Sequence, residues 1–260
     1  MPGVGENSVQ SVDRALDILE YLAEQKKSCG VTEIGNAVKL HKSTVHRLLH
    51  TLMYKGYIER DIDSDNYSLG KKVLFLASTV LDRMDVRSIA KPYIKRLSES
   101  VNEVVHLSIL DGNEAVYIDK MESTRQSSVR MHSQIGKRVP LYCTAVGKVL
   151  ISNHEDEEVK ALLKGQEMKK FTSNTIDNIE DFIDTIHRVR ERGYSMDEME
   201  HEEGIRCVAA PIYDRKGNII ASVSISSPIF YMTEERLPEL KEQLLRASKD
   251  ISSQLGYFMR

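Results

Sequence analysis

The hydrophobic pattern near the N-terminus predicts two short helices joined by a tight turn. Apolar residues recur every three to four positions, first in residues 31–38 and again in residues 42–54. An amphipathic stretch before them, residues 8–25, predicts a third helix packed beneath this pair, with Ser11 as its N-cap. The pattern is typical of a helix-turn-helix, although many ordinary helix pairs share it.

Two short runs of strand-forming residues follow. Residues 57–60 and 67–70 flank a turn rich in Asp, Ser and Asn, which predicts a β-hairpin. Residues 1–70 are therefore expected to form a winged helix-turn-helix with this hairpin as the wing. Residues 71–85 carry one apolar stripe. We expect a linker helix there, packed either against its copy in another subunit or against its own domains.

Residues 86–260 show a different pattern, in which hairpin-joined strands are interspersed with amphipathic helices. Turn residues at 111–113 and 214–218 join neighbouring strands, and residues 134–143 are expected to be a loop. The pattern predicts an α+β domain with an antiparallel sheet flanked by helices. The expected helices are 86–100, 144–153, 155–163, 177–192 and 233–257, and the expected strands are 103–110, 115–121, 127–133, 194–199, 205–213 and 219–226.

Composition and charge narrow the class of protein. A chain of 260 residues is long enough for two domains, and its net charge of −3 suits one local DNA-binding face better than a wholly basic surface. Cys29, Cys143 and Cys207 are odd in number and have no metal-like spacing, which favours a reducing cytoplasm. Because no apolar run approaches the length of a membrane span, we expect a cytoplasmic protein without a membrane partner.

The polar face of the stretch 42–54 is suited to contact DNA. No Asp or Glu occurs from Lys39 to Gly56, and the exposed positions carry hydroxyls, imidazoles and cations that can reach phosphates and base edges. Arg14 and Arg60 are expected to hold the DNA backbone, although Arg14 can equally form an ion pair within its own helix. The expected contacts of the second helix are Lys42, Ser43, Thr44, His46, Arg47 and His50. The sequence thus predicts a helix that enters the major groove of double-stranded DNA.

Several short motifs, in the same order along the chain, resemble the IclR family of bacterial transcription regulators. They are KSTV at 42–45, TAVGK at 144–148, EGIRCVAAP at 203–211 and VSIS at 223–226. The resemblance spans nearly the whole chain. It implies an N-terminal winged helix, a linker helix and a C-terminal GAF-like domain that binds an effector. It also implies homodimers or dimers of dimers.

Three further segments are similar to one branch of that family, whose members repress genes for pectin and hexuronate breakdown. These segments are residues 130–138, 140–142 and 253–257. The resemblance implies a repressor that 2-keto-3-deoxygluconate releases from its operator. A regulator that responds to another small carboxylate or an aromatic acid is the alternative, since few pocket residues decide ligand preference.

The start of the helix expected at Thr144 is a candidate anion site. Its first backbone N–H groups are free, Ala145 is small, and a ligand carboxylate can approach closely. The family resemblance places Leu141, Ala145, Val146, Asp197, Ile205, Cys207, Ser224 and Ser226 around the effector. We add Met131 and His132, which lie on the strand expected next to the same loop. Each of these residues also has a structural explanation. The two serines can be outward-facing polar residues of a strand, Thr144 can be a simple helix cap, and Cys207 can be a small buried apolar residue.

Other classes of protein fit the sequence less well. Cys143 or Cys207 could pair with His106, His132 or His201 as nucleophile and base, but no flanking signature supports an enzyme. Asp197, His201 and Cys207 have ligand types suited to zinc but no recognised spacing, which leaves a metal or redox sensor as a minority hypothesis. An RNA-binding winged helix is disfavoured by the ligand-sized C-terminal domain. We therefore expect a regulator without catalytic residues, cofactor or bound metal.

Overall fold

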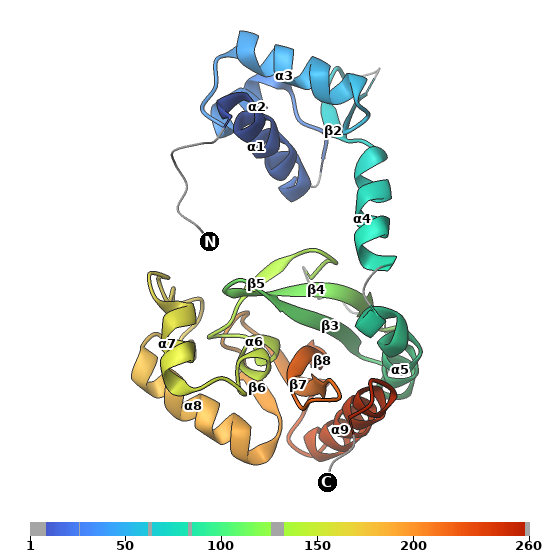
Figure 1. Ribbon diagram of the computed structural model, residues 1–260, viewed down its shortest axis with the longest axis vertical. Helices are drawn as coiled ribbons and strands as arrows, with labels where there is room; N and C mark the ends of the chain where they lie inside the picture. The colour runs from blue at the N-terminus through green and yellow to red at the C-terminus, as the bar shows by residue number, and fades with distance from the viewer. Residues whose placement is uncertain (1–8, 26, 62–63, 83–84, 126–132, 258–260) are drawn as a thin grey trace. The chain divides into compact units, whose positions relative to one another are not determined.

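The computed structural model has the α+β fold that the sequence predicts, with a winged helix-turn-helix followed by a curled antiparallel sheet and its helices (Figure 1). It describes residues 9–25, 27–61, 64–82, 85–125 and 133–257. The chain forms two compact units, Met1–Arg83 and Met84–Arg260, which are described separately below.

The first unit contains the predicted helices and the predicted hairpin. Its elements are α1 (Gln10–Glu24), α2 (Val31–Ala37), α3 (Lys42–Tyr54), β1 (Ile58–Arg60), β2 (Tyr67–Leu69) and α4 (Lys72–Asp82). The apolar faces of α1, α2 and α3 meet in one core that includes Ile18, Ile34 and Val45, each without exposed surface. Strands β1 and β2 pair antiparallel with Ile58 opposite Leu69.

Local details of this unit differ from the prediction. Ser11 lies inside α1, whose N-cap is Val9 without a side-chain hydrogen bond, so the predicted serine cap is wrong. Cys29, between α1 and α2, forms an isolated antiparallel β-bridge with Tyr67 and so adds a third segment to the wing. In the turn before α3, Lys39 has a φ of 53°, a left-handed conformation rare for a residue with a side chain.

The second unit is built on one six-stranded antiparallel sheet in the order β5-β4-β3-β8-β7-β6. Its helices are α5 (Asp85–Val101), α6 (Ala145–Leu150), α7 (Asp156–Leu163), α8 (Ile179–Arg192) and α9 (Leu237–Gln254). Its strands are β3 (Val104–Asp111), β4 (Glu114–Met121), β5 (Arg138–Pro140), β6 (Ser195–Glu198), β7 (Ile205–Tyr213) and β8 (Ile219–Pro228).

The two faces of this sheet are covered by different helices. Helices α5 and α9 pack on one face, and α6, α7 and α8 cover the other (Figure 1). Because neighbouring strand residues point to opposite faces, Val105 and Leu107 join the α5–α9 core while His106 and Ser108 belong to the α6 face. That second face is therefore unusually polar for a buried surface.

Two segments of this unit differ from the prediction, and a third lies mostly outside the described residues. Residues 138–140, expected in a loop, form the edge strand β5, and the helix after Thr144 ends at Leu150 rather than near residue 153. The strand expected at 127–133 lies outside the described residues except for Ser133, which is not in a strand.

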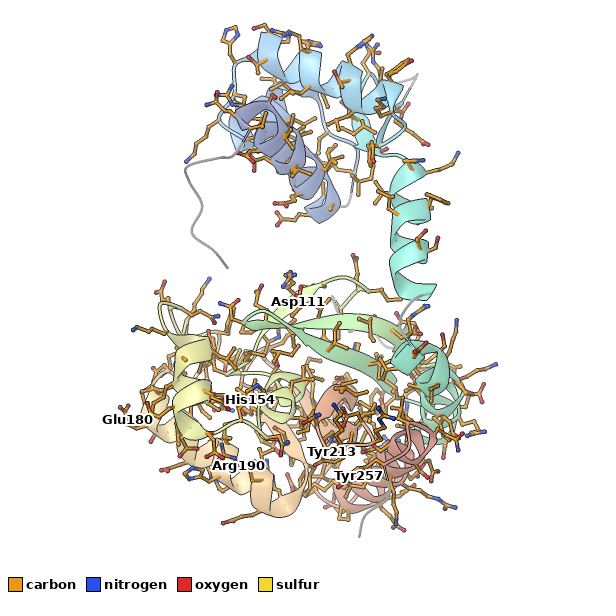
Figure 2. All side chains as sticks on the ribbon, viewed as in Figure 1. Asp111, His154, Glu180, Arg190, Tyr213 and Tyr257 are labelled. Carbon is orange, nitrogen blue, oxygen red and sulfur yellow. The ribbon has the colours of Figure 1, made fainter. Side chains whose placement is uncertain are left out.

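Side-chain contacts fix the outer elements of the second unit. Arg190 of α8 donates from Nε to the carbonyl of Ser152, at 2.8 Å, and a second guanidinium nitrogen reaches the carbonyl of His154 (Figure 2). Tyr257 stacks on Tyr213, with 4.7 Å between ring centroids, and so holds the end of the described chain against β7 (Figure 2). These contacts brace the helices that surround the polar face of the sheet.

Candidate functional site

Helix α3 presents its polar face to solvent. Its predicted contact residues Lys42, Ser43, His46, Arg47 and His50 are exposed, and Thr44 is half-buried. On the opposite side, Val45, Leu49 and Leu52 fill the core of the unit. The helix is thus anchored by its apolar stripe, and side chains that can contact phosphates and bases are free to do so.

The structure brings cations from three elements to one groove of the first unit. Arg14 of α1 and Arg60 of β1 line it together with Thr44, His46, Arg47 and His50 of α3. Within the described residues Arg14 forms no ion pair, which leaves its guanidinium free of the intrahelical pairing considered above.

Arg60 has an ion-pair partner at the wing. Its guanidinium lies 2.8 Å from a carboxylate oxygen of Asp65, and the two side chains are 47% and 75% exposed. So exposed a pair contributes little stability, and a phosphate can compete for the arginine.

His41 is a residue of this surface that the sequence pattern did not indicate. It is the N-cap of α3, and its Nδ1 accepts from the backbone N–H of Ser43 at 3.4 Å and lies 2.9 Å from the Ser43 hydroxyl. Histidine is not among the preferred N-cap residues, so propensity gave no signal. Its exposed ring adds a third imidazole next to the predicted contact residues His46 and His50.

A cavity in the second unit lies between the polar face of the sheet and the start of α6. Strand register aligns its lining side chains: Asp197 pairs with Cys207, Cys207 with Ser226, and His106 with Ser224. The predicted residues that line it are Thr144, Ala145, Val146, Asp197, Ile205, Cys207, Ser224 and Ser226. Four segments far apart in the sequence therefore contribute the residues predicted for one pocket.

Not every residue predicted for the pocket lines this cavity. Leu141 is fully buried in the core next to α6, where its backbone abuts Gly147, and its contact with an effector stays a prediction. A Cβ added at Gly147 would lie 2.4 Å from the Cα of Leu141, which explains why glycine is needed here. Met131 and His132 lie outside the described residues.

Thr144 forms the N-cap of α6, as its position predicts. Its Oγ1 accepts from the N–H of Gly147 at 3.2 Å and donates to the carbonyl of Pro140 at 2.6 Å. Among the described residues, the N–H groups of Ala145 and Val146 have no acceptor, as is usual in the first turn of a helix. They are the donors that an anion in this cavity can use.

Asp197 is the carboxylate of the cavity. Its side chain is almost wholly buried, and Oδ1 accepts from the N–H groups of Glu200 at 2.6 Å and His201 at 3.4 Å. Burial raises the pKa of Asp197 to about 7, against the lowering effects of Lys148 and of the Glu200 N–H. The group therefore titrates near neutral pH.

A buried ion pair supports the loop after Asp197. Lys148 of α6 is 1% exposed, and its Nζ lies 2.5 Å from Oε1 of Glu200 and 3.0 Å from the carbonyl oxygen of Met196. The Thr175 hydroxyl holds the same loop by donating to the carbonyl of Glu200 at 2.6 Å. These bonds fix the position of Asp197 relative to α6.

Several further residues line the cavity without a ligand-binding signal in the sequence. They are His106, Tyr117, Ser133, Lys137, Val139, His201 and Glu202. His106 lies 2.8 Å from the Ser133 hydroxyl and 3.4 Å from the Ser226 hydroxyl, and burial lowers its pKa to about 3, so its ring is neutral. The pairing of β3 with β8 places His106 beside Ser224, and no motif joins the other lining residues in the sequence.

The alternative interpretations of the polar residues can now be weighed. Ser224 and Ser226 are buried rather than outward-facing, and the hydroxyl of Ser224 has no partner among the described residues. Burial raises the pKa of both Cys143 and Cys207, which keeps these thiols protonated and poorly nucleophilic. Within the described ranges no group of three or more His, Cys, Asp and Glu side chains is placed to hold a metal ion, and no helix can cross a membrane.

The fold and these two sites together define a class, that of winged-helix transcription regulators with a separate α+β domain. Residues 11–61 match the IclR helix-turn-helix domain, and residues 78–253 match the C-terminal domain of the bacterial transcriptional regulator IclR. The chain belongs to the IclR family.

Individual relatives agree over almost the full length. The chain is 41% identical to the HTH-type transcriptional regulator KdgR of Escherichia coli K12 over 251 residues, covering 96% of this chain and 94% of that protein. It is 38% identical to the regulator XynR of the same organism over 249 residues, covering 96% and 98%. The crystal structure of Thermotoga maritima IclR superposes with a TM-score of 0.79 at 35% identity, covering 95% and 99%.

Proposed function

We propose that this chain is an operator-binding repressor that a small organic acid releases from DNA. Residues 1–70 are the DNA-binding domain, 71–85 the linker, and 86–260 the effector-binding domain. Helix α3 enters the major groove, where Lys42, Ser43 and Thr44 near its N-terminus read bases. The regulator acts in the cytoplasm, without catalytic activity, cofactor or metal.

The unpartnered hydroxyl of Ser224 carries the effector half of this proposal. A buried hydroxyl without a partner costs free energy, and a ligand oxygen in the cavity would satisfy it. The free N–H groups at the start of α6 suit a carboxylate, while Asp197 and Ser226 suit hydroxyl groups. A polyhydroxy acid has both kinds of group, and the 41% identity to KdgR makes 2-keto-3-deoxygluconate the first candidate.

The same proposal includes a homodimer, with a dimer of dimers as the further possibility. Leu74 and Phe75 of α4 are 71% and 61% exposed, and Val12 and Leu16 of α1 are also exposed. So much apolar surface on one small unit suits contact with a second copy. Two copies would also place two recognition helices against successive half-sites. Leu74→Glu should therefore lower the oligomeric state in sedimentation velocity.

Fluorescence anisotropy tests the proposal directly. The purified chain is titrated onto labelled DNA from upstream of its own gene, at fixed salt, with 2-keto-3-deoxygluconate, pyruvate or 4-hydroxybenzoate added. We expect tight binding that only the sugar acid reverses. Release by another of these acids would support the regulatory function but identify a different effector. Absence of sequence-specific binding would refute the operator-binding function.

A pair of serine variants tests whether the effector binds in the cavity. Ser224→Ala removes the unpartnered hydroxyl, and we expect about 2- to 10-fold weaker effector binding. Ser222→Ala is the matched control: it lies on the same strand, but its buried hydroxyl already donates to the carbonyl of Ala210 at 3.3 Å. Equal effects of the two substitutions on effector binding would remove Ser224 from the pocket.

A further inference from the structure

The buried charges around the cavity do not balance once Asp197 is ionised. Lys148 is the buried cation whose charge acts on Asp197, yet its Nζ is committed to Glu200 at 2.5 Å and to the carbonyl oxygen of Met196 at 3.0 Å. Lys148 and Glu200 thus largely neutralise each other. No cationic side chain of the described residues donates to Asp197, whose Oδ1 accepts only from two backbone N–H groups.

The other titratable groups around Asp197 do not supply the missing charge. Lys137 and Glu202 line the cavity with opposite charges. His106 of β3 is held neutral, and the pKa of His201 is lowered, in both cases first by burial.

The remaining groups are neutral acids that can only add negative charge. They are Tyr117 of β4, Cys143 before α6 and Cys207 of β7, and in each of them burial is the first cause of a raised pKa. An ionised Asp197 would therefore leave net negative charge in the pocket proposed for an acid.

We infer that the pocket binds its acid effector together with one proton, which Asp197 takes up as the ligand carboxylate enters. The inference rests on the proposed function, because it needs an anionic effector in this cavity. Two carboxylates in one buried site cannot both remain ionised without a cation between them, so one of them holds a proton. A free acid of ordinary pKa arrives ionised at neutral pH, and the proton comes from solvent to a carboxylate oxygen of Asp197. The protonated group can then donate a hydrogen bond to the ligand.

The titration of the empty pocket fixes the pH range of the effect. Burial already raises the pKa of Asp197 to about 7, so the empty pocket exchanges this proton near neutral pH. A bound carboxylate raises that pKa further. The dissociation constant of the effector should therefore be nearly flat below pH 7 and rise about tenfold per pH unit above it. The regulator would respond to its effector more strongly in an acidified cell.

Calorimetry on the full-length chain measures this coupling. The probes are 2-keto-3-deoxygluconate, pyruvate and 4-hydroxybenzoate, each titrated from pH 5.5 to 9. Parallel titrations in HEPES and Tris, which buffer near pH 8 and differ in heat of ionisation, count the protons taken up. We expect uptake that approaches one proton per site at pH 8. Asp197→Asn, a neutral carboxamide of the same shape, should bind at pH 8.5 at least as tightly as wild type and lose both the uptake and the pH dependence.

The control is Asp184→Asn on the exposed side of α8, which should keep the wild-type pH profile. Effector binding that is equally tight at pH 6 and pH 9 would overturn the inference and leave the proposed function intact. Loss of binding by a folded Asp197→Asn protein at every pH would also overturn it, because the ionised carboxylate would then be the required acceptor. If no acid binds at any pH, the effector half of the proposed function fails and the inference falls with it.

Discussion

The buried pair between Lys148 and Glu200 allows a quantitative prediction. The two side chains are 1% and 9% exposed, and Oε2 of Glu200 has no partner among the described residues. Lys148→Met keeps the aliphatic stem but removes the charge, so the Glu200 carboxylate is left buried without its cation. Breaking such a pair from one side costs about 3–5 kcal/mol of folding free energy, because the uncompensated charge stays desolvated.

The double variant separates this explanation from simple loss of packing. Glu200→Gln alone should cost a similar amount, because it strands the ammonium of Lys148. Lys148→Met combined with Glu200→Gln leaves no buried charge, so it should lose less than the sum of the single changes, with a coupling of about 3 kcal/mol. Urea unfolding followed by far-UV circular dichroism is the suitable assay, since the chain has no tryptophan to report by fluorescence.

A matched surface pair provides the control. Lys160 lies 2.6 Å from Glu157 in α7, the same kind of contact between exposed side chains. Lys160→Met should leave the unfolding midpoint unchanged within error, because water already solvates both groups. A loss below about 1 kcal/mol for Lys148→Met, or a double variant equal to the sum of its parts, would refute the reasoning.

Three other outcomes follow from the structure. Arg47→Ala should weaken operator binding about 5- to 100-fold in fluorescence anisotropy without loss of circular dichroism signal, while Lys164→Ala, an equal change of charge on an exposed residue of the second unit, should not. Gly147→Ala should destabilise the second unit by about 3 kcal/mol in urea unfolding, since its Cβ would overlap the backbone of Leu141 at 2.4 Å. The pKa of Asp197 is raised to about 7 in the folded protein, from about 4 in the unfolded chain. The stabilisation that follows from protonating Asp197 is therefore complete below pH 4 and is lost as the pH rises to 7. Asp197→Asn should flatten that part of the measured pH dependence, which is of order 4 kcal/mol.

Local pattern was sufficient to predict most elements of this fold. The period of apolar residues placed α1, α2 and α3, and the strand expected at 205–213 matches β7 at both ends. The sequence pattern missed β5, because its three residues, which include Arg138 and Pro140, show no alternation of apolar and polar positions. They form a strand only by pairing with β4. It also assigned a helix cap to Ser11, where backbone geometry rather than side-chain propensity decides the start of α1.

The pocket was harder to predict from the sequence, for a different physical reason. Thr144 could be identified from its position before an apolar run, which is a local signal. The proximity of His106 to Ser224 depends on strand register, which joins residues more than a hundred positions apart. Lys148 could not be predicted as a buried residue, because a lysine is normally exposed to solvent. Its burial makes sense only when the loop that carries Glu200 is packed against α6.

That packing ties the geometry of the pocket to its charge. Because Lys148 binds the carbonyl of Met196 and the carboxylate of Glu200, it holds the residues on both sides of Asp197 against α6. The same commitment prevents the lysine from neutralising Asp197 itself. A lysine that bonded Asp197 instead would keep its carboxylate ionised, so that the group could not donate a hydrogen bond to a ligand. The observed arrangement fixes the position of Asp197 without pairing it with the lysine, and this combination suits the proton uptake that we infer for the proposed hydroxylated acid.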